Sequence, residues 1–368
     1  MKVSAPGKQM IAGEWAVLEL SNPCIVASIN KRVFVEIDDN DEISVSVKDF
    51  DIKDITADFD GKNIIWNNAT EEQKAKLIFA KGAIETALQY IGDYKPFRIN
   101  SWGEESQIEV NGVMKKIGFG SSAASVVAII GAILKFNGYD IESKKSKDVI
   151  YKLSTIAHFF AQGKVGSAFD VAASTYGGLT FYKRFDPKWL TEQINSGKSV
   201  KEIAESNWPG FHVEKLDIPE DFILLIGWTK ESSSTVNLVK SMDTFKNSNP
   251  EEYKRIYSEI GALVKKLFNA WKHENKDEII SLIRENEILL RELTYKSGLP
   301  IETHELKTLS EIANKCGGAG KLSGAGGGDC GIAVCFDQRT ADCIVKQWEK
   351  AGLYFVNATI DIDGIKVE

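Results

Sequence analysis

Three glycine-bearing segments lie near the start, the middle and the end of the 368-residue chain. The middle segment reads Lys116-Ile117-Gly118-Phe119-Gly120-Ser121-Ser122-Ala123-Ala124, and the apolar run that follows predicts a helix over 121–136. Glycines let a backbone approach a ligand closely, and the free amides at the start of a helix bind anions. The two serines would cap the helix, bind phosphate or reach Mg²⁺. A serine-capped helix without a ligand is the alternative, since the spacing fits neither a Walker A loop nor a dinucleotide-binding fingerprint.

The last segment, residues 317–331, lies between a predicted helix at 304–315 and a predicted strand at 331–336. A flexible linker is one interpretation, but linkers do not usually run straight into an apolar strand, so a backbone nest for an anion fits better. The first segment runs from Ala5 to Trp15. There Lys8 follows a predicted strand and a Pro-Gly turn, which would hold its ammonium near a phosphate. A solvated surface lysine is the alternative.

The rest of the pattern mixes strands and helices. Strands are predicted in the first 60 residues and over 178–185, 222–228 and 353–361, and helices over 71–91, 146–162, 339–350 and twice within 251–293. Asn111-Gly112 between two short apolar runs predicts a hairpin. Because hairpin connections are frequent, an α+β architecture is favoured over doubly wound α/β. The lysine-rich stretch 186–220, which carries three prolines, is the predicted lobe boundary.

Charge and composition exclude several classes of protein. The chain has 45 Lys and Arg against 52 Asp and Glu, a net charge of −7, which argues against nucleic-acid binding. It contains no apolar run of about 18 residues, so no membrane span is predicted. Five cysteines without CxxC spacing predict free buried thiols rather than disulfides or a zinc site, and four histidines lack the spacing of a zinc hydrolase. We therefore expect a protein of the reducing cytoplasm.

Together the three segments resemble the GHMP kinase superfamily of galactokinases, homoserine kinases, mevalonate kinases and phosphomevalonate kinases. The pattern PGK…GE falls at residues 6–14, G-x-G-S-S-A-A at 118–124 and S-G-A-G-G-G-D at 323–329, so the resemblance spans essentially the whole chain. It implies two lobes with the active site between them. The N-terminal lobe, residues 1–215, would resemble ribosomal protein S5 domain 2 and contain a left-handed βαβ unit. The C-terminal lobe, residues 216–368, would be ferredoxin-like.

One further stretch resembles the phosphomevalonate kinase branch, especially its eukaryotic type. It runs from Ala157 to Ala173 and continues at 176–185 and 227–235, with two departures: Trp15 stands where many relatives have His or Tyr, and Ala168 where Gly is usual. This resemblance implies transfer of the γ-phosphoryl group of ATP, with Mg²⁺, to the phosphate of 5-phosphomevalonate. The alternatives are a sibling kinase with an alcohol acceptor, such as mevalonate or homoserine kinase, and a catalytically inactive ligand sensor. We expect only small-molecule partners, no membrane association, and a monomer or homodimer.

The resemblance also implies roles for single residues. Lys8 and Asp170 match the catalytic pair, the segment Gly118 to Ala124 would cradle the ATP phosphates, and Ser122 is the candidate Mg²⁺ ligand. The expected substrate contacts are Lys8, Gln162, Lys164, Ser167, Asp170, Ser323, Gly324 and Ala325, with Ser233, Ser234 and Thr235 as weaker candidates. A phosphate monoester is largely ionised at neutral pH, because its second pKa is near 6, so little base catalysis is needed. We expect Lys8 to bridge the two phosphates and Asp170 to orient Lys8. His158, in an apolar stretch, is predicted to be a core histidine.

Overall fold

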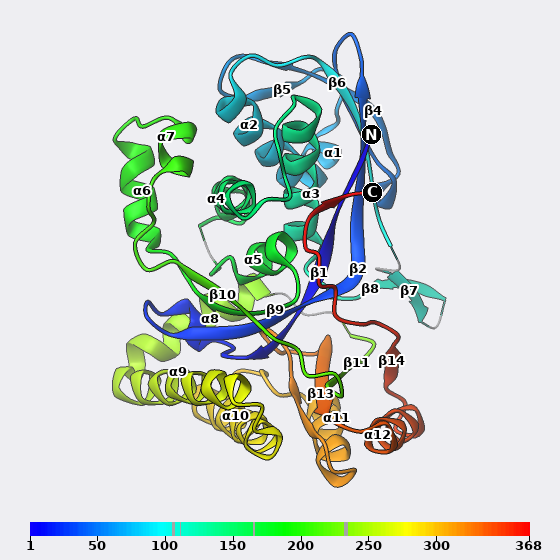
Figure 1. Cartoon of the computed structure of the whole chain (residues 1–368), viewed down its shortest axis with the longest axis vertical. Coiled ribbons are helices and arrows are strands. Elements are labelled where there is room, and N and C mark those ends of the chain that lie inside the picture. Colours follow the sequence, from blue (N-terminus) through cyan, green and yellow to red (C-terminus); the bar gives the residue numbers. More distant parts are fainter. Residues whose placement is uncertain (105–106, 111, 165, 232–234) are drawn as a thin grey trace.

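The computed structural model describes residues 1–104, 107–110, 112–164, 166–231 and 235–368. Helices and strands are mixed in two lobes, one above the other in Figure 1, so the predicted α+β class is confirmed. In the part of the chain that is described, no helix is long and apolar enough to cross a membrane.

A nine-stranded sheet forms the framework of the upper lobe. Its strands are β1 (Lys2–Ala12), β2 (Pro23–Asp39), β3 (Ile43–Val47), β4 (Ile52–Phe59), β5 (Ile64–Trp66), β6 (Phe97–Gly103), β9 (Leu179–Lys183), β10 (His212–Leu216) and β15 (Lys366–Val367). The path runs β10-β9-β2-β6-β3-β4-β5, and β1 pairs with β2 and β15. Among the described strands of this sheet only β3 and β6 pair in parallel.

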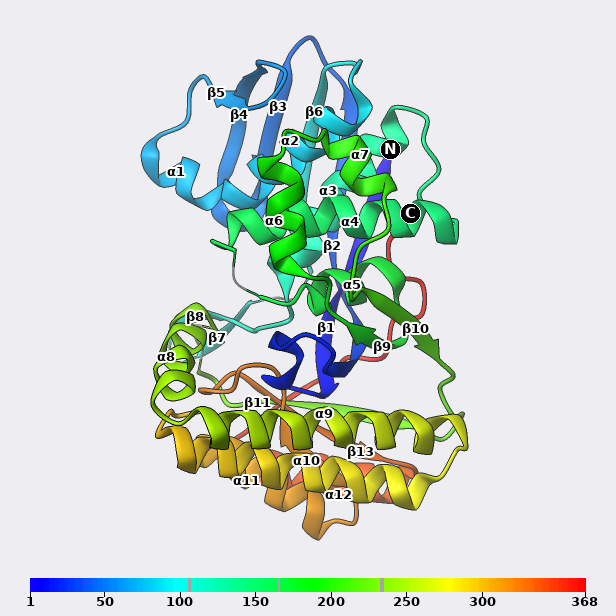
Figure 2. The same ribbon diagram turned by 90° about the vertical axis from the view of Figure 1, so that its left-hand side faces the viewer.

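Helices cover one side of this sheet (Figure 2). They are α1 (Glu71–Lys76), α2 (Ile78–Ile91), α3 (Ser121–Phe136), α4 (Lys144–Ala161), α5 (Phe169–Tyr176), α6 (Pro187–Asn195) and α7 (Val200–Glu205). The predicted helix 121–136 is found with those bounds, because Gly120 precedes it and Asn137-Gly138 ends it. The predicted helix 71–91 is two helices that share Leu77 as their boundary. A small hairpin, β7 (Gln107–Val110) with β8 (Val113–Lys116), lies ahead of α3.

The lower lobe is built on an antiparallel sheet of four strands in the order β12-β13-β11-β14. Its elements are β11 (Ile223–Trp228), α8 (Thr235–Ser248), α9 (Pro250–Lys272), α10 (Lys276–Ser297), α11 (His304–Lys315), β12 (Ala319–Leu322), β13 (Cys330–Cys335), α12 (Gln338–Lys350) and β14 (Tyr354–Val356). Numbered along the chain, the strands lie in the order 2-3-1-4, which is the ferredoxin-like arrangement that was predicted.

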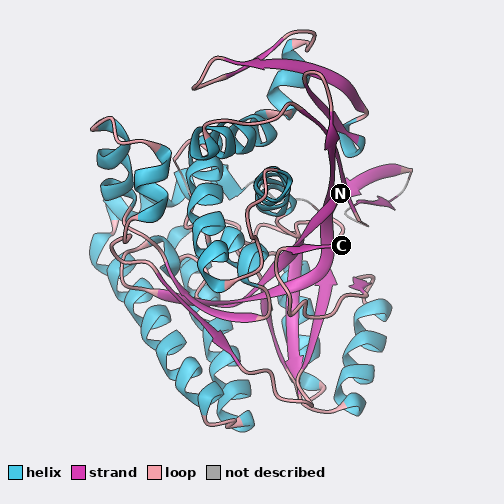
Figure 3. Ribbon diagram, turned by 45° about the horizontal axis from the view of Figure 1, so that its top comes forward, coloured by secondary structure: helices cyan, strands magenta, loops and turns pink. Residues whose placement is uncertain are grey.

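The two lobes share one hydrophobic cluster. Ile11, Ile25 and Phe119 of the upper lobe belong to the same buried cluster as Trp228 and Ile256 of the lower lobe. The last residues of the chain return to the upper sheet, where Val367 pairs with Val3 and the N- and C-termini lie near each other (Figure 3). The division at residues 215 and 216 stays a prediction, and the final strand crosses it because β15 pairs with β1.

Several local predictions are wrong. Pro6 and Gly7 form no turn before Lys8, because β1 continues through them beside β2 with a register shift at that point. Helices α5 and α8 were not predicted, and strand β12 lies inside the glycine-rich segment that was predicted to be loop. Strand β12 forms because β13 offers it a partner, which is a contact that no local pattern reveals.

The prediction that all cysteines are free thiols is also wrong, because Cys316 and Cys343 form a disulfide. Cys316 caps the end of α11 and Cys343 lies in α12, and packing of the two helices brings their Cα atoms to 5.9 Å. That separation is within the usual range for disulfides. Cys24, Cys330 and Cys335 are free and buried, as predicted.

Candidate active site

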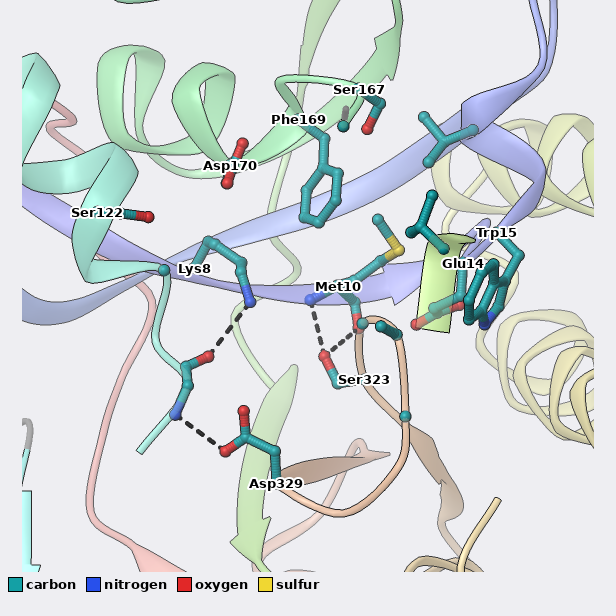
Figure 4. A pocket seen from close by; sticks show the side chains of 18 of the residues that line it. Lys8, Met10, Glu14, Trp15, Ser122, Ser167, Phe169, Asp170, Ser323 and Asp329 are labelled. Carbon is teal, nitrogen blue, oxygen red and sulfur yellow. Dashed lines mark hydrogen bonds between the residues drawn. The ribbon is translucent and has the colours of Figure 1, made fainter. Parts of the chain in front are cut away.

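A cavity of about 360 Å³ brings the three glycine-bearing segments together. Its wall includes Lys8 of β1, the loop before α3, Asp170 of α5 and the loop after β12 (Figure 4). The predicted site residues on this wall are Lys8, Gly118, Gly120, Ser121, Ser122, Gln162, Ser167, Asp170, Ser323, Gly324 and Ala325. Segments more than 100 residues apart in sequence therefore meet at one site.

The loop before α3 presents its backbone to the cavity. Gly120 caps α3 with φ 75°, a left-handed conformation that glycine adopts without steric cost. The first amides of α3 have no partner within the helix, so they and the helix dipole favour an anion at this end. No side chain of the described residues caps α3, so the alternative of a serine-capped helix does not hold. Phe119, Ala123 and Ala124 are buried behind the loop, so any contact they make with a nucleotide goes through the backbone.

Lys8 is joined to this loop at two points. Its backbone N–H donates to Phe119 O at 2.8 Å, and its Nζ donates to Gly118 O at 3.3 Å. The ammonium also lies 6.0 Å from the centre of the Phe169 ring. Lys8 is therefore held at the loop that precedes α3, and its strand brings the side chain into the cavity (Figure 4).

Asp170 lies in the first turn of α5, where the positive end of the helix dipole stabilises a carboxylate. The Val171 N–H donates to Asp170 Oδ1 at 3.0 Å. Ala168 is the N-cap of this helix and has φ 60°, a left-handed conformation. For a residue with a side chain that conformation costs about 1 kcal/mol or more. The departure from Gly at 168 therefore strains this turn, yet it still delivers Asp170 to the cavity.

The third segment is fixed to the first by Ser323. The Ser323 hydroxyl accepts from the Met10 N–H at 2.9 Å, and Gln9 Oε1 and Met10 O lie within 2.8 Å and 3.0 Å of it as acceptors. Further along, Gly327 N–H donates to Ile301 O at 2.9 Å. A side chain at Gly326 would approach Ile301 O to 2.1 Å, so only glycine fits there. These contacts shape the loop that lines the cavity opposite α3 and α5.

Asp329 is a site residue to which sequence reasoning gave no role, although it closes the S-G-A-G-G-G-D motif. Its Oδ1 accepts from the Gly118 N–H at 2.9 Å, so it ties the lower lobe to the loop before α3. Burial raises the pKa of Asp329, while the Gly118 hydrogen bond and the charge of Lys8 oppose that rise. A Cβ at Gly118 would lie 1.7 Å from Asp329 Oδ2, which explains the need for glycine at 118.

Glu14 and Lys321 form a buried ion pair that sequence reasoning also missed. Both side chains are fully buried, and Lys321 Nζ donates to Glu14 Oε1 and, at 2.6 Å, to Leu322 O. Burial raises the pKa of Glu14 and the charge of Lys321 opposes that rise. Glu14 lines the cavity, as does Trp15, the other departure from the family pattern. Glu14 stands within the PGK…GE pattern, but nothing in the sequence marks Lys321, 307 residues away, as its partner.

His158 is buried, as predicted, and contacts a site residue. Its Nε2 lies 3.2 Å from Ser122 Oγ, and its ring stacks on Phe79 with the centres 5.1 Å apart. The predicted candidate Lys164 is exposed over the Phe160 ring and does not reach the cavity wall. Ser233 and Ser234 lie outside the described residues, as does the side chain of Thr235.

Oxygen donors on the cavity wall suit Mg²⁺. They are the hydroxyls of Ser121 and Ser122 and the carboxylates of Asp170 and Asp329. Mg²⁺ prefers such ligands and usually completes its shell with water and substrate phosphates. Within the described ranges no three acidic, histidine or cysteine side chains gather as a self-contained metal site. The donor set therefore fits an ion that binds together with a nucleotide.

A helix start with unpaired amides, a lysine and a carboxylate meet in one cavity between the two lobes, which is the arrangement expected of a small-molecule kinase. Two family models agree: the N-terminal domain of GHMP kinases matches residues 79–178, and the C-terminal model of GHMP kinases matches residues 239–353. The chain belongs to the GHMP kinase family.

Similar proteins cover the whole chain. A phosphomevalonate kinase from Streptomyces sp. strain CL190 is 29% identical, over 98% of this chain and 97% of its own length. The crystal structure of a Lin0012 protein from Listeria innocua is 30% identical, with a TM-score of 0.88 over 100% of this chain and 99% of that one. The structure of Streptococcus pneumoniae phosphomevalonate kinase in complex with phosphomevalonate and AMPPNP is 24% identical, with a TM-score of 0.81 over 98% and 99%. At that identity the last comparison supports the fold.

Proposed function

We propose that this chain transfers the γ-phosphoryl group of ATP to the phosphate of 5-phosphomevalonate, giving 5-diphosphomevalonate and ADP. The observation that carries the proposal is the cavity that unites Lys8, Asp170 and the start of α3. The full-length likeness to a phosphomevalonate kinase supports this choice of acceptor. The bond between the γ-phosphorus and its bridging oxygen breaks, and a bond forms between that phosphorus and an acceptor phosphate oxygen.

The nucleotide phosphates lie at the start of α3, where the amides that follow Gly120 have no helical partner. Ser122 and a wall carboxylate would hold Mg²⁺ together with the phosphates, and the ion would compensate part of their charge. In this proposal Lys8 Nζ, which donates to Gly118 O in the structure, contacts both the γ-phosphate and the acceptor phosphate. Because both reactants are anions, this ammonium lowers their repulsion and stabilises the charge that develops during transfer.

Asp170 acts as an orienting group for Lys8 in this proposal. Lys8 Nζ donates to Gly118 O, and the Asp170 carboxylate faces the same cavity from α5 (Figure 4). Once phosphates occupy the loop, Asp170 is the carboxylate that draws Lys8 toward the acceptor. The acceptor phosphate is already ionised at neutral pH, so Asp170 does not need to remove a proton.

The acceptor binds beside the loop that follows β12. Ser323, Gly324 and Ala325 line this part of the cavity, and Gln162 and Ser167 line the part next to α5. Ser323 is already bound to the backbone of Met10, so it holds the wall in shape as well as facing the acceptor.

The test is a coupled ADP-release assay with phosphomevalonate, mevalonate and homoserine as acceptors. We expect turnover with phosphomevalonate alone. Lys8→Met should lower kcat/KM by about 100-fold or more, because it removes a charge that contacts the transferring group. Exposed Lys62→Met is the matched control and should keep wild-type rates.

Three outcomes contradict the proposal. Turnover only with an alcohol acceptor assigns the chain to a sibling kinase. ATP binding without turnover of any acceptor identifies a ligand sensor. Near-normal turnover of Lys8→Met together with loss of turnover in Asp170→Asn reverses the roles of the two residues.

A further inference from the structure

Arg184 follows β9 and is buried, with 8% of its surface exposed. In the described part of the chain no carboxylate lies within 4.0 Å of its guanidinium. Glu19, one of the acidic residues near enough to affect its pKa, is already bound to Lys246 and Tyr253. Burying an unpaired cation is costly, and burial accordingly lowers the pKa of Arg184. A buried charge without a counterion calls for an anion that is not part of the chain.

The position of this guanidinium is directly behind the cavity wall. Its Nη2 donates to Gly166 O at 3.0 Å and its Nη1 donates to Leu18 O. Gly166 and Leu18 both line the cavity, on segments that are 148 residues apart in sequence. Arg184 therefore joins two parts of the wall and places a positive charge behind them.

Ser167, next to Gly166, offers a free donor at the same place. Its side chain is 2% exposed and lines the cavity, and its hydroxyl has no hydrogen-bond partner among the described residues. Its backbone is fixed, since the Tyr182 hydroxyl donates to Ser167 O at 2.5 Å and Tyr182 is in turn bound to Tyr151 at 2.8 Å. In Figure 4 Ser167 and Lys8 lie on opposite sides of the Phe169 ring.

We propose that Ser167 and Arg184 form the subsite for the non-reacting carboxylate of the acceptor. The inference rests on the proposed function, because 5-phosphomevalonate carries its phosphate and its carboxylate at opposite ends of one short chain. With the phosphate at Lys8, the carboxylate lies across the Phe169 ring at Ser167. The Ser167 hydroxyl donates to it, and Arg184 supplies positive charge through the wall while it holds Gly166 and Leu18 in place. Ser167 binds the substrate, and Arg184 is a positioning residue.

The test compares phosphomevalonate with its carboxamide analogue, in which the carboxylate is a neutral amide. For Arg184→Gln we expect the KM for phosphomevalonate to rise about tenfold or more, since a hydrogen-bonded charged partner loses its support. The kcat and the KM for ATP should stay within about threefold of wild type. With the carboxamide, Arg184→Gln and wild type should have similar KM values. Arg184→Lys, which keeps the charge and loses the two-point clamp, should fall between them.

Ser167→Ala removes only the hydroxyl and keeps the proposal testable if Arg184→Gln does not fold. It should raise the KM for phosphomevalonate more than the KM for the carboxamide, because a hydroxyl donates a stronger hydrogen bond to a carboxylate than to a neutral amide oxygen. Lys183→Gln is the matched control, because it removes the neighbouring positive charge, which lies over the Phe181 ring and off the cavity wall. It should have wild-type KM values for both acceptors.

The proposed subsite would be overturned if the Ser167 and Arg184 variants raised the KM for phosphomevalonate and the KM for its carboxamide equally. It would also be overturned if these variants raised only the KM for ATP. Wild-type turnover of mevalonate but not phosphomevalonate would overturn the proposed function alone. The same comparison made with mevalonate and its carboxamide then decides the subsite. Wild-type protein that turns over no acceptor overturns both.

Discussion

Replacing Lys321 with methionine should destabilise the protein in a pH-dependent way. Methionine is similar in length and apolar, so it fills the fully buried space of Lys321. What it removes is the only cation in contact with Glu14 among the described residues. The carboxyl group, itself fully buried, must then either stay charged without a partner or take up a proton.

The magnitude follows from the cost of that proton. The ordinary pKa of the Glu14 carboxyl is 4.5, so keeping it protonated at pH 7 costs about 3.4 kcal/mol at 1.36 kcal/mol per pH unit. Burial already raises the pKa of Glu14 in the wild type, so part of this cost is present before the substitution. We therefore expect a loss of about 2–3 kcal/mol at pH 7, near the lower end of the range for broken buried ion pairs.

The sign of the pH dependence follows from the same protonation. In Lys321→Met the folded state holds a proton that the unfolded state releases above its pKa of 4.5. Stability relative to wild type is therefore highest at and below about pH 4.5, and it falls as the pH rises toward the folded-state pKa. Glu14→Gln leaves the Lys321 ammonium without a partner, and its deficit should instead shrink as the pH rises. The double variant should show neither trend.

Urea unfolding of the four proteins at pH 5 and pH 8, followed by tryptophan fluorescence, measures these differences. A Lys321→Met deficit of the same size at both pH values would refute the reasoning, because the loss would then come from packing. A deficit below about 1 kcal/mol at pH 8 would show that the pair contributes little beyond an apolar contact of the same volume.

Two further predictions concern groups next to the loop that precedes α3. Asp329→Ala should raise the KM for ATP by about tenfold, because the substitution leaves the Gly118 N–H without its acceptor and loosens the loop. Asp329→Asn keeps an acceptor oxygen and should change the KM for ATP by less than about threefold. Equal KM values for the two variants would contradict this. His158→Phe keeps the stack on Phe79 and loses the contact with Ser122, so the Mg²⁺ concentration for half-maximal turnover should rise about tenfold. An unchanged Mg²⁺ dependence would mean that His158 only fills the core.

The sequence predicted correctly those elements whose two ends are marked by local signals such as glycine. The helix 121–136 is preceded by Gly120 and followed by Asn137-Gly138, and its bounds are as predicted. Helix α5 was not predicted because it begins after a left-handed Ala168, and no typical cap residue marks its start. Strand β12 was not predicted because glycine has a low preference for strands, which the pairing with β13 outweighs. The Pro-Gly pair in β1 reads locally as a turn, but the pairing with β2 keeps it extended.

The site also has parts that the sequence predicts and parts that it does not. The glycine-rich segments are visible in the sequence because the backbone needs glycine at fixed places: a side chain at Gly118 would meet Asp329, and one at Gly120 would crowd Lys8. The groups that hold these segments are not visible, because their partners are set by tertiary packing. Asp329 meets Gly118 across 211 residues, and Lys321 meets Glu14 across 307. A single sequence does not show such pairs, so the glycine-rich segments could be recognised from the sequence and the residues that hold them could not.

A net charge of −7 by itself disfavours anionic ligands, but the cavity contains local groups that oppose this effect. Among the described residues of the wall, Lys8 is the only cation, whereas Glu14, Asp170 and Asp329 are acidic. Side-chain charge alone would repel a nucleotide. Behind the wall, the buried Lys321 ammonium compensates the charge of Glu14, and the buried Arg184 guanidinium is a second cation. The remaining attraction comes from the amides at the start of α3, whose partial charges do not enter a count of residues. The proposed phosphate binding therefore depends on backbone geometry, and substitutions that shift the loop at 118–120 should weaken it more than removal of surface lysines.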